Sequence, residues 1–383
     1  MKDKNKDLSD VSDLNVYIYR DGGLGDSLTI LPAVNKLYES MGGKKKFTLI
    51  TNGSAHKFNK INSYEILKYS GFFENVLYFD DGKLSSKVNL LKDIKKSKTG
   101  KILYYFGYTD IPLGRALKKT LLHLSFFKLC GFKKVIGWRQ SITDNKKNKE
   151  NGGVESEYSR YLRIVGAADI AAATGTAAAE GKNGNTNQNN EIFLNLDYAK
   201  PGADKLIMDF DINADGRYVS IGIGGLYEVN RYFNKRYGEI IKMIAGKFKD
   251  IGFVLIGGIN DFEDGEKIKK GLPEELNKKV ANICGKSSII ESAYIMGNGL
   301  LYIGNDNGTT HLAAMSGCPV AAVFSAREKK EKYFPYGKNN IVIRKNIECE
   351  NCGLKICAEK NTKCVDAITA EEVFAAALKL IRV

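Results

Sequence analysis

The feature that most constrains the fold is an alternation of strand-length apolar runs with longer segments of helical period. From Val16 onwards the runs rich in β-branched and aromatic residues are VYIY, FTLI, NVLYF, KILYYF and KVIGW. Strands that alternate with helices form a parallel sheet whose two faces are covered by the helices. We therefore expect an α/β domain over residues 15–166, preceded by a polar tail at residues 1–14.

A second alternation follows, with the runs YVSIGIGG, IGFVLIGG, ANICG, LLYIGN and PVAAVFS. It predicts a second α/β domain over residues 191–368 and a C-terminal helix over 369–383, where Thr369 is an N-cap three residues ahead of Glu372. The segment between the halves, residues 167–190, is rich first in Ala and then in Gly, Asn and Gln, which indicates a low-complexity insertion or linker. A cleft between two such domains is the expected place for a ligand.

The net charge of +14 favours an acidic partner, because a positive field raises encounter rates with anions. Nucleic acid, anionic lipid and a phosphorylated sugar all fit this charge. Nucleic-acid binding predicts basic residues gathered on a recognisable module, whereas these lysines are spread along the chain, so we expect no nucleic-acid partner. The first fifteen residues lack the apolar centre of a secretory signal, which predicts a cytoplasmic protein.

Four of the seven cysteines crowd the end of the chain, in the spacing C-x2-C-x4-C-x6-C. They are Cys349, Cys352, Cys357 and Cys364. Two interpretations stay open, a structural metal held by thiolates or a cluster of reduced, unliganded thiols. The other three, Cys130, Cys284 and Cys318, lie in apolar surroundings and are predicted to be small core residues.

The glycine run in "YRDGGLGDSL" follows the first strand and resembles a dinucleotide-binding turn. That fingerprint requires a third glycine where Leu28 stands, and an acidic residue about twenty positions further on, at the end of the second strand, where Thr51 and Asn52 stand instead. A carboxylate at the helix start, Asp26, would also repel a pyrophosphate. The sequence therefore argues against a dinucleotide at this turn.

Asp26 has two interpretations. As a helix cap, its side chain accepts backbone N–H groups that the helix leaves without partners, worth about 1 kcal/mol. As a general base, it lies where open α/β sheets bind ligands, at the carboxyl end of a strand.

A second informative turn lies within "LLYIGNDNGTTHLAAMSGCPVAAVFS", residues 300–325. A strand ends near Gly304, a polar turn follows, and a short helix is expected from about His311 to Gly317. The turn aims backbone N–H groups and two threonine hydroxyls from a helix N-terminus, which suits a phosphate. A helix N-terminus disfavours a cationic imidazole, so His311 should be neutral unless an anion lies beside it. Simple capping or packing is the alternative for His311.

The segments "GDSLTILPAVNKL", "ICGKSSIIESAYIMGNGLLYIG" and "NDNGTTHLAAMSGCPVAAVFS" together resemble glycosyltransferase family 9, the ADP-heptose:lipopolysaccharide heptosyltransferases. This resemblance runs from about Val16 to the C-terminal helix. It implies a GT-B architecture, in which two Rossmann-like domains with parallel sheets face each other across a cleft. The acceptor would bind the N-terminal domain and the nucleotide sugar the C-terminal domain.

The resemblance also implies site residues. Asp26 corresponds to the catalytic base of the family's G-D motif, and Asp306, Gly308 and His311 match its D-x-G-x-x-H motif for the donor diphosphate. Glycines replace the hydroxyl residues that family members carry after the first C-terminal strand. The predicted donor-binding set is Gly224, Gly225, Arg231, Asp306, Asn307, Gly308, Thr309, Thr310 and His311. The predicted acceptor-binding set is Gly23, Gly25 and Arg139.

The function so implied is inverting transfer of heptose or a related sugar from a nucleotide-diphosphate donor to a lipopolysaccharide-type or other cell-surface glycan. No cofactor is expected for catalysis, and no D-x-D metal motif is evident. The basic charge suits transient docking on an anionic inner membrane that carries lipid-linked acceptors. Two alternatives are a different nucleotide-sugar enzyme on this fold and a non-catalytic nucleotide- or glycan-binding protein.

Overall fold

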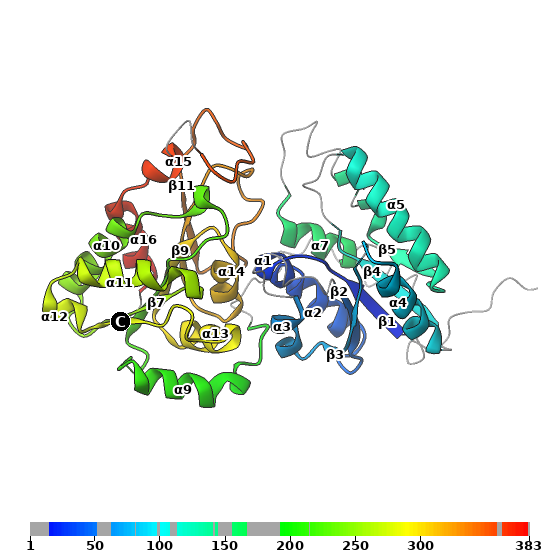
Figure 1. Cartoon of the computed structure of the whole chain (residues 1–383), viewed down its shortest axis with the longest axis horizontal. Helices are drawn as coiled ribbons and strands as arrows, with labels where there is room; N and C mark the ends of the chain where they lie inside the picture. Colours follow the sequence, from blue (N-terminus) through cyan, green and yellow to red (C-terminus); the bar gives the residue numbers. More distant parts are fainter. Residues whose placement is uncertain are drawn as a thin grey trace, which may run out of the picture. The chain divides into compact units, whose positions relative to one another are not determined.

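The computed structural model describes residues 15–51, 63–80, 82–97, 100–107, 113–140, 142–144, 155–166, 192–213, 215–357 and 362–381. The chain divides into two compact units, residues 1–187 and 188–383. Each is built on one parallel sheet with helices on its faces (Figure 1), which confirms the predicted α/β class. The predicted tail at 1–14 and the low-complexity segment at 167–190 lie outside the described residues.

The sheet of the first unit has the order β3-β2-β1-β4-β5, with every pair parallel. Its strands are β1 (Asn15–Tyr19), β2 (Phe47–Thr51), β3 (Phe73–Tyr78), β4 (Lys101–Tyr105) and β5 (Lys134–Ile136). All five coincide with predicted apolar runs. The inner strands β1, β2 and β4 are buried at nearly every position, and such strands read as continuous apolar runs, whereas the edge strands β3 and β5 are partly exposed.

Helices cover both faces of this sheet. They are α1 (Leu24–Leu28), α2 (Leu31–Ser40), α3 (Ser63–Leu67), α4 (Leu84–Lys96), α5 (Leu113–Leu129) and α7 (Glu157–Gly166), with the 3-10 turn η3 (Lys68–Ser70). Tyr17 and Tyr19 of β1 pack with Leu90 of α4 and Phe127 of α5. Alternate residues of a strand face opposite ways, so Val16 and Ile18 point to the other face, on which α2 and α7 pack together (Figure 1).

The sheet of the second unit has the order β11-β10-β9-β6-β7-β8, again all parallel. Its strands are β6 (Tyr218–Gly222), β7 (Gly252–Ile256), β8 (Val280–Asn282), β9 (Leu301–Asn305), β10 (Val320–Phe324) and β11 (Asn340–Arg344). The edge strand β11 has no counterpart among the predicted strands. It is half-buried along its length, and its apolar run is confined to residues 341–343, between Asn340 and Arg344.

The helices of the second unit are α9 (Lys200–Asp209), α10 (Asn234–Lys247), α11 (Phe262–Lys270), α12 (Glu274–Asn277), α13 (Ile289–Asn298), α14 (Gly308–Met315), α15 (Lys363–Asp366) and α16 (Ala370–Leu380). Short 3-10 turns are η4 (Leu196–Ala199), η5 (Glu228–Asn230) and η6 (Ile259–Asp261). Ile221 of β6 packs with Ile240 of α10 and Val373 of α16. On the opposite face the Tyr218 hydroxyl donates to the Ile295 carbonyl of α13, at 2.6 Å.

Two helix boundaries differ from expectation. The apolar-periodic stretch at 27–41 contains two helices, α1 and α2, because the chain turns at Thr29 and Ile30 before Pro32 opens α2. Helix α14 begins at Gly308, three residues before the expected start. Two other predicted boundaries are confirmed. Gly317, with φ +82°, follows the end of α14. Thr369 accepts a hydrogen bond from the Glu372 amide at the start of α16.

Each sheet has a switch point, where successive strands are added on opposite sides of the first strand. In the first unit β1 has β2 on one side and β4 on the other, and in the second unit β6 lies between β7 and β9. Open α/β sheets bind ligands beyond the carboxyl ends of the strands at such points. Asp26 lies after β1 in α1, and the predicted donor-binding residues lie after β6 and after β9, the latter in the turn before α14 and in its first residues.

Candidate functional site

Asp26 is the third residue of α1, and two groups fix its carboxylate. Its Oδ2 accepts a hydrogen bond from the Gly23 amide at 3.1 Å, and its Oδ1 lies 3.1 Å from Nη2 of Arg20. A third of the Asp26 side chain stays exposed. The capping interpretation therefore holds in part, and an oriented carboxylate still reaches the surface of the unit.

Arg20, the first residue after β1, holds the backbone of Asp26 as well. Its Nε donates to the Asp26 carbonyl at 2.8 Å, and its Nη1 donates to the Phe106 carbonyl, after β4, at 3.1 Å. The Thr29 hydroxyl donates to the same Asp26 carbonyl at 2.8 Å. Arg20 is 1% exposed, so a buried guanidinium determines where Asp26 points.

A second buried charge pair lies beside Arg20. Arg160 Nη2 lies 2.7 Å from Glu157 Oε2 and also donates to the Gly107 carbonyl. The Tyr161 ring centroid is 5.3 Å from the Arg20 guanidinium and 4.3 Å from that of Arg160. Burial raises the pKa of Glu157, but attraction to Arg160 outweighs it and holds that pKa below its usual value. The ion pair therefore stays charged.

Sequence reasoning missed Arg20, Glu157 and Arg160. The position of Arg20 at the carboxyl end of β1 was a usable signal, since charged residues there face the switch point. The i, i+3 spacing of Glu157 and Arg160 was another. Their contacts with Phe106 and Gly107 join segments more than fifty residues apart, and no local pattern announces such contacts.

The predicted acceptor residues lie at the same sheet edge as Asp26. The Gly23 amide is engaged by Asp26, and its carbonyl accepts hydrogen bonds from Ser27. Gly25 is the second residue of α1. Arg139 follows β5, is exposed, and has its guanidinium 5.4 Å from the Trp138 ring centroid. Acceptor binding by these residues stays a prediction.

In the second unit, two asparagine side chains tie the loop after β9 to the loop after β6. Asn305 is fully buried; it accepts from the Tyr232 amide at 2.9 Å and the Tyr237 hydroxyl at 2.8 Å, and it donates to the carbonyls of Ile223 and Gly224. The Asn307 side chain donates to the same Gly224 carbonyl, at 2.6 Å. The two loops at the switch point are therefore held as one structure.

Helix α14 presents its N-terminus at this turn. Asn307 is its N-cap and accepts from the Thr310 amide at 3.1 Å. The helix itself offers no acceptor for the amides of Gly308 and Thr309, so these two are placed for an anion. Thr310 is buried and its hydroxyl donates to the Asn305 carbonyl. Both threonine hydroxyls were expected to point towards a phosphate. This expectation is wrong for Thr310, because its hydroxyl stabilises the turn instead.

Asp306 is an acid in an unfavourable environment. Burial, helped by the nearby Glu328, raises its pKa to about 7 against the lowering effect of Arg327 and Arg344. The amide nitrogen of the Asn230 side chain donates to the Asp306 carbonyl at 3.0 Å, and the Ser325 hydroxyl orients that amide through a 2.7 Å bond. A strongly raised pKa at a switch point is typical of functional sites. Sequence reasoning missed Asn230 and Ser325.

His311 is 4% exposed and lies in the first turns of α14. Burial lowers its pKa to about 4, so the imidazole is neutral at pH 7. This agrees with the expectation from the helix N-terminus. A hydrogen bond from His311 to a donor phosphate stays a prediction.

The loop after β6 brings its backbone close to Asp261 of η6. A Cβ atom on Gly224 would lie 2.6 Å from Asp261 Oδ2, so a larger residue there would displace the Asp261 carboxylate. Arg231 Nη2 lies 2.9 Å from Asp261 Oδ1, and Arg231 Nε donates to the Gly225 carbonyl at 3.1 Å. Arg231 of the predicted donor-binding set thus lies beside this loop and is paired with Asp261.

The cysteine-rich segment follows β11. Cys352 is exposed, Cys349 and Cys357 are half-buried, and Cys364 is buried in α15, where burial raises the pKa of its thiol. In the part of the chain that the structure describes, no three His, Cys, Asp or Glu side chains are grouped as metal ligands. Residues 358–361 of this segment are not described, and the structural metal stays a prediction. Cys130, Cys284 and Cys318 are buried, as expected.

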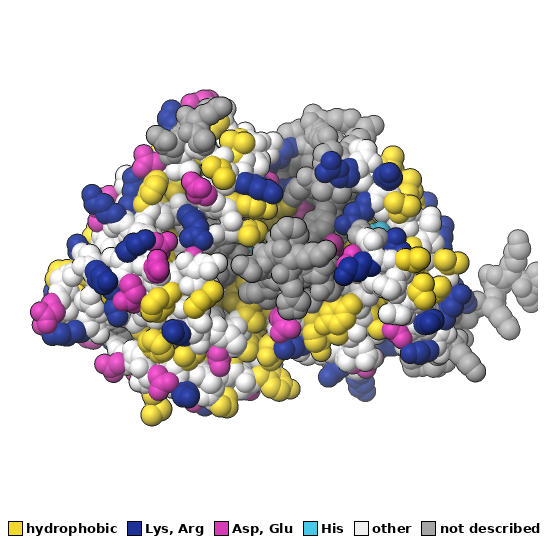
Figure 2. Space-filling model, in the orientation of Figure 1, with side chains coloured by type: hydrophobic (Ala, Val, Ile, Leu, Met, Phe, Trp, Pro, Cys, Tyr) yellow, Lys and Arg dark blue, Asp and Glu magenta, His cyan; other side chains and the backbone are white. Residues whose placement is uncertain are grey.

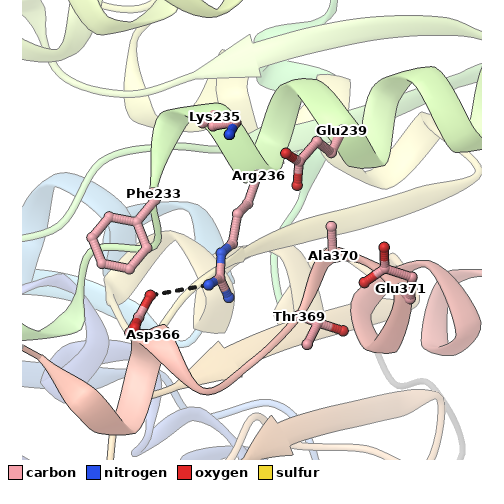
Figure 3. A pocket seen from close by; sticks show the side chains of 8 residues that line it. All are labelled: Phe233, Lys235, Arg236, Glu239, Asp366, Thr369, Ala370 and Glu371. Atoms are coloured by element: carbon pink, nitrogen blue, oxygen red, sulfur yellow. Dashed lines mark hydrogen bonds and ion pairs between the residues drawn. The ribbon is translucent and has the colours of Figure 1, made fainter.

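A pocket of about 500 Å³ lies between the N-terminal ends of α10 and α16 (Figure 3). Its lining residues are Phe233, Lys235, Arg236, Glu239, Asp366, Thr369, Ala370 and Glu371. Arg236 already pairs with Asp366 at 3.0 Å and donates to the Ile368 carbonyl. None of the predicted donor-binding residues lines this pocket, so it is separate from the turn at Asn305–Thr310.

Comparison with known proteins decides the family. The model of glycosyltransferase family 9 (heptosyltransferase) matches residues 170–363, a little over half of the chain. The chain belongs to this family. The predicted resemblance is therefore confirmed, and the matched residues include the loops after β6 and β9.

The relatives agree with this membership. Lipooligosaccharide heptosyltransferase 2 of Haemophilus influenzae is 28% identical over 120 residues, which are 31% of this chain and 34% of that protein. The chain thus spans about a third of the length of this curated relative. Among solved structures, E. coli ADP-heptose lps heptosyltransferase II has a TM-score of 0.65 at 14% identity, with 96% of this chain and 98% of that chain covered.

A second solved structure has the same fold. The E. coli heptosyltransferase determined with ADP-2-deoxy-2-fluoro heptose has a TM-score of 0.61 at 15% identity, with 95% of this chain and 99% of that chain covered. At 14% and 15% identity, these two structural similarities show the fold of the chain and not its activity.

Proposed function

We propose that this chain is an inverting glycosyltransferase. It moves heptose or a related sugar from a nucleoside-diphosphate donor to a hydroxyl of a lipopolysaccharide-type or other cell-surface glycan. The observation that carries the proposal is the turn from Asn305 to His311, a helix N-terminus placed at a switch point in a family 9 chain. We further propose that the protein acts in the cytoplasm and makes transient contact with an anionic membrane that holds a lipid-linked acceptor.

The donor assignment rests on charge and on the relatives. Two free amides at the start of α14, those of Gly308 and Thr309, suit the oxygens of a diphosphate. Arg231 adds a cation from the loop after β6. One solved relative of this fold is named for ADP-heptose and another was determined with an ADP-heptose analogue, so we propose an ADP-sugar as the donor.

The chemistry divides between the two units. Asp26 takes the proton of an acceptor hydroxyl while the oxygen forms a bond to the anomeric carbon of the donor. The bond from that carbon to the diphosphate oxygen breaks on the opposite face, which inverts the configuration, through an oxocarbenium-like transition state. The leaving diphosphate keeps the electron pair, and the amides at the start of α14 stabilise its growing charge. These steps use no metal.

The test combines donor binding with turnover. Purified protein is heated with ADP-, UDP- and GDP-sugars, because a ligand that binds only the folded state raises stability, by about 2.7 kcal/mol at a hundred times its Kd. ADP-sugars should stabilise most. A preference for UDP- or GDP-sugars would point to another nucleotide-sugar enzyme of this fold, and no stabilisation by any of them would contradict the donor site.

Asp26→Asn then tests the general base. The change keeps the side-chain shape and removes the proton acceptor, so kcat should fall by about 10²- to 10⁴-fold, while stabilisation by the donor persists. Asp21→Asn is the matched control in the same turn, because Asp21 pairs with Lys119 at 3.6 Å. Equal turnover of Asp26→Asn and wild type would remove Asp26 from the mechanism.

A further inference from the structure

Helix α5 has an apolar outer face that the fold of its unit does not explain. Thr120, His123, Phe127 and Cys130 form the buried side. On the opposite side, leucines are exposed by 41% at Leu117, 44% at Leu121, 61% at Leu122 and 63% at Leu129. A surface helix normally carries polar residues opposite the core, because exposed leucine gains nothing from folding. We call these four leucines, with Arg115, Lys118 and Lys128, the α5 outer face.

The charges of this face are of one sign. Helix α5 contains Arg115, Lys118, Lys119 and Lys128 and no acidic residue. Arg115, Lys118 and Lys128 are exposed among the leucines, and Lys119 pairs with Asp21. Figure 2 shows hydrophobic side chains and Lys or Arg side chains interspersed over the region of α5.

The neighbouring helix extends the same pattern. Helix α4 covers the same face of the sheet, since Leu90 and Ile94 pack in one cluster with Phe127. Its exposed side carries Leu84 and Val88. Its sequence, LSSKVNLLKDIKK, holds four lysines and one aspartate. Both helices on this face of the sheet therefore carry exposed apolar and basic side chains.

This combination decides what the surface fits. A nucleic-acid surface would gain nothing from exposed leucines. A second copy of the same face would bring like charges together. Leucines set among Lys and Arg are typical of helices that lie in the interface of an anionic bilayer, with the apolar side chains among the acyl groups and the cations at the headgroups. Among the described residues no helix is both long and apolar enough to cross a bilayer, so such contact is with the membrane surface.

We propose that the α5 outer face docks the protein on a bilayer that contains anionic phospholipid. This surface would make the membrane contact that is part of the proposed function. The proposal rests on that function, since a lipid-linked acceptor lies at such a bilayer. The leucines enter the interface, and Arg115, Lys118 and Lys128 contact lipid phosphates. Salt should weaken binding, because exposed charge pairs are screened.

The experiment measures binding of the full chain to vesicles of phosphatidylcholine, with and without phosphatidylglycerol, by co-sedimentation. Wild type should bind the anionic vesicles at least tenfold more tightly than the neutral ones. Leu121→Ser/Leu122→Ser and, separately, Lys118→Gln/Lys128→Gln should each weaken that binding at least tenfold. Tyr198→Ser/Met208→Ser and Lys267→Gln/Lys278→Gln are the controls, because they change exposed apolar and basic residues of the second unit, and they should bind as wild type does.

Three results would overturn the proposal. They are equal binding to neutral and anionic vesicles, unchanged binding of both α5 variants, and a dimer in sedimentation velocity that the leucine variant abolishes, which would assign the face to a second copy.

A transfer assay with a water-soluble acceptor, freed of its lipid, distinguishes failure of this proposal from failure of the proposed function. Leu121→Ser/Leu122→Ser should transfer sugar to it at the wild-type rate, whereas absence of transfer by wild type with intact vesicle binding would contradict the enzymatic proposal alone.

Discussion

Asp306 is held in an environment that opposes its ionisation, and this has a measurable cost. Its folded-state pKa of about 7 lies above the unfolded value of 3.8. The folded chain therefore binds the proton more readily, and the stability gained from the protonated acid is lost as the pH rises through 7. Above pH 7 a charge is kept where protein atoms crowd it. Sites that keep such a cost are typically functional.

We predict that Asp306→Asn raises the free energy of unfolding at pH 8 by about 1 kcal/mol or more, because it removes the crowded charge. At the same pH it should lower the turnover of the nucleotide sugar. Urea unfolding at pH 8 and pH 5 checks the first part, since the gain should shrink at pH 5, where the acid is protonated. Asp264→Asn, at an exposed ion pair of α11, is the control. A loss of stability at pH 8 would contradict the crowded-charge account.

At the scale of elements, the loops after β6 and β9 act together because Asn305 joins them. Asn282, at the end of β8, is an equally buried asparagine that bonds to the Phe262 carbonyl, Glu266 and the Cys284 amide. Each holds its surroundings through hydrogen bonds, but Asn305 alone of the two lies at the switch point. Comparing variants of Asn305 and Asn282 therefore distinguishes a role in stability from a role in donor binding.

We predict that Asn305→Ala and Asn282→Ala each lower the free energy of unfolding by about 1 to 3 kcal/mol, because buried partners lose their hydrogen bonds. Asn305→Ala should also weaken ADP binding at least tenfold, since the Ile223 carbonyl loses its bond to the β9 turn and the Gly224 carbonyl keeps only the one from Asn307. Calorimetric titration with ADP measures this. Equal ADP affinity in the two variants would show that Asn305 matters for folding only.

The elements found from the sequence are those whose signal is local. Ten strands follow from continuous apolar runs, and the caps at Thr369 and Gly317 follow from residue type. The strand β11 was missed although residues 341–343 form a short apolar run, because no helix separates it from β10 and it therefore falls outside the alternation of strands and helices. In the site, the Asp26 turn and the polar turn before α14 were placed correctly, whereas the start of α14 at Gly308 and the inward hydroxyl of Thr310 were not. The support of Asp26 by Arg20 depends on Phe106, far along the chain, and no local pattern could reveal it.

At the scale of the whole molecule, two titrating groups of the second unit affect its stability in opposite directions. His311 has a folded pKa of about 4 against 6.5 unfolded. The unfolded chain binds this proton first, so the stability due to neutral His311 is complete above pH 6.5 and is lost as the pH falls towards 4. The stability due to protonated Asp306 instead increases as the pH falls, over much of the same range. The two effects largely cancel in the wild type. The free energy of unfolding of the wild type should therefore change little with pH on account of these two groups.

Removing one group should therefore expose the other. We predict that the stability of His311→Gln, relative to wild type, rises by up to about 3 kcal/mol as the pH falls from 7 to 4, because the variant no longer resists protonation. Any constant loss from altered packing cancels in this comparison, as do the carboxylates common to both proteins. Because the chain has two units with separate cores, unfolding is followed by hydrogen exchange of α14 amides, which reports the second unit alone. A difference between His311→Gln and wild type that stays flat from pH 7 to pH 4 would show that His311 titrates alike in the folded and unfolded chain, and would remove the buried neutral imidazole from the account of the donor site.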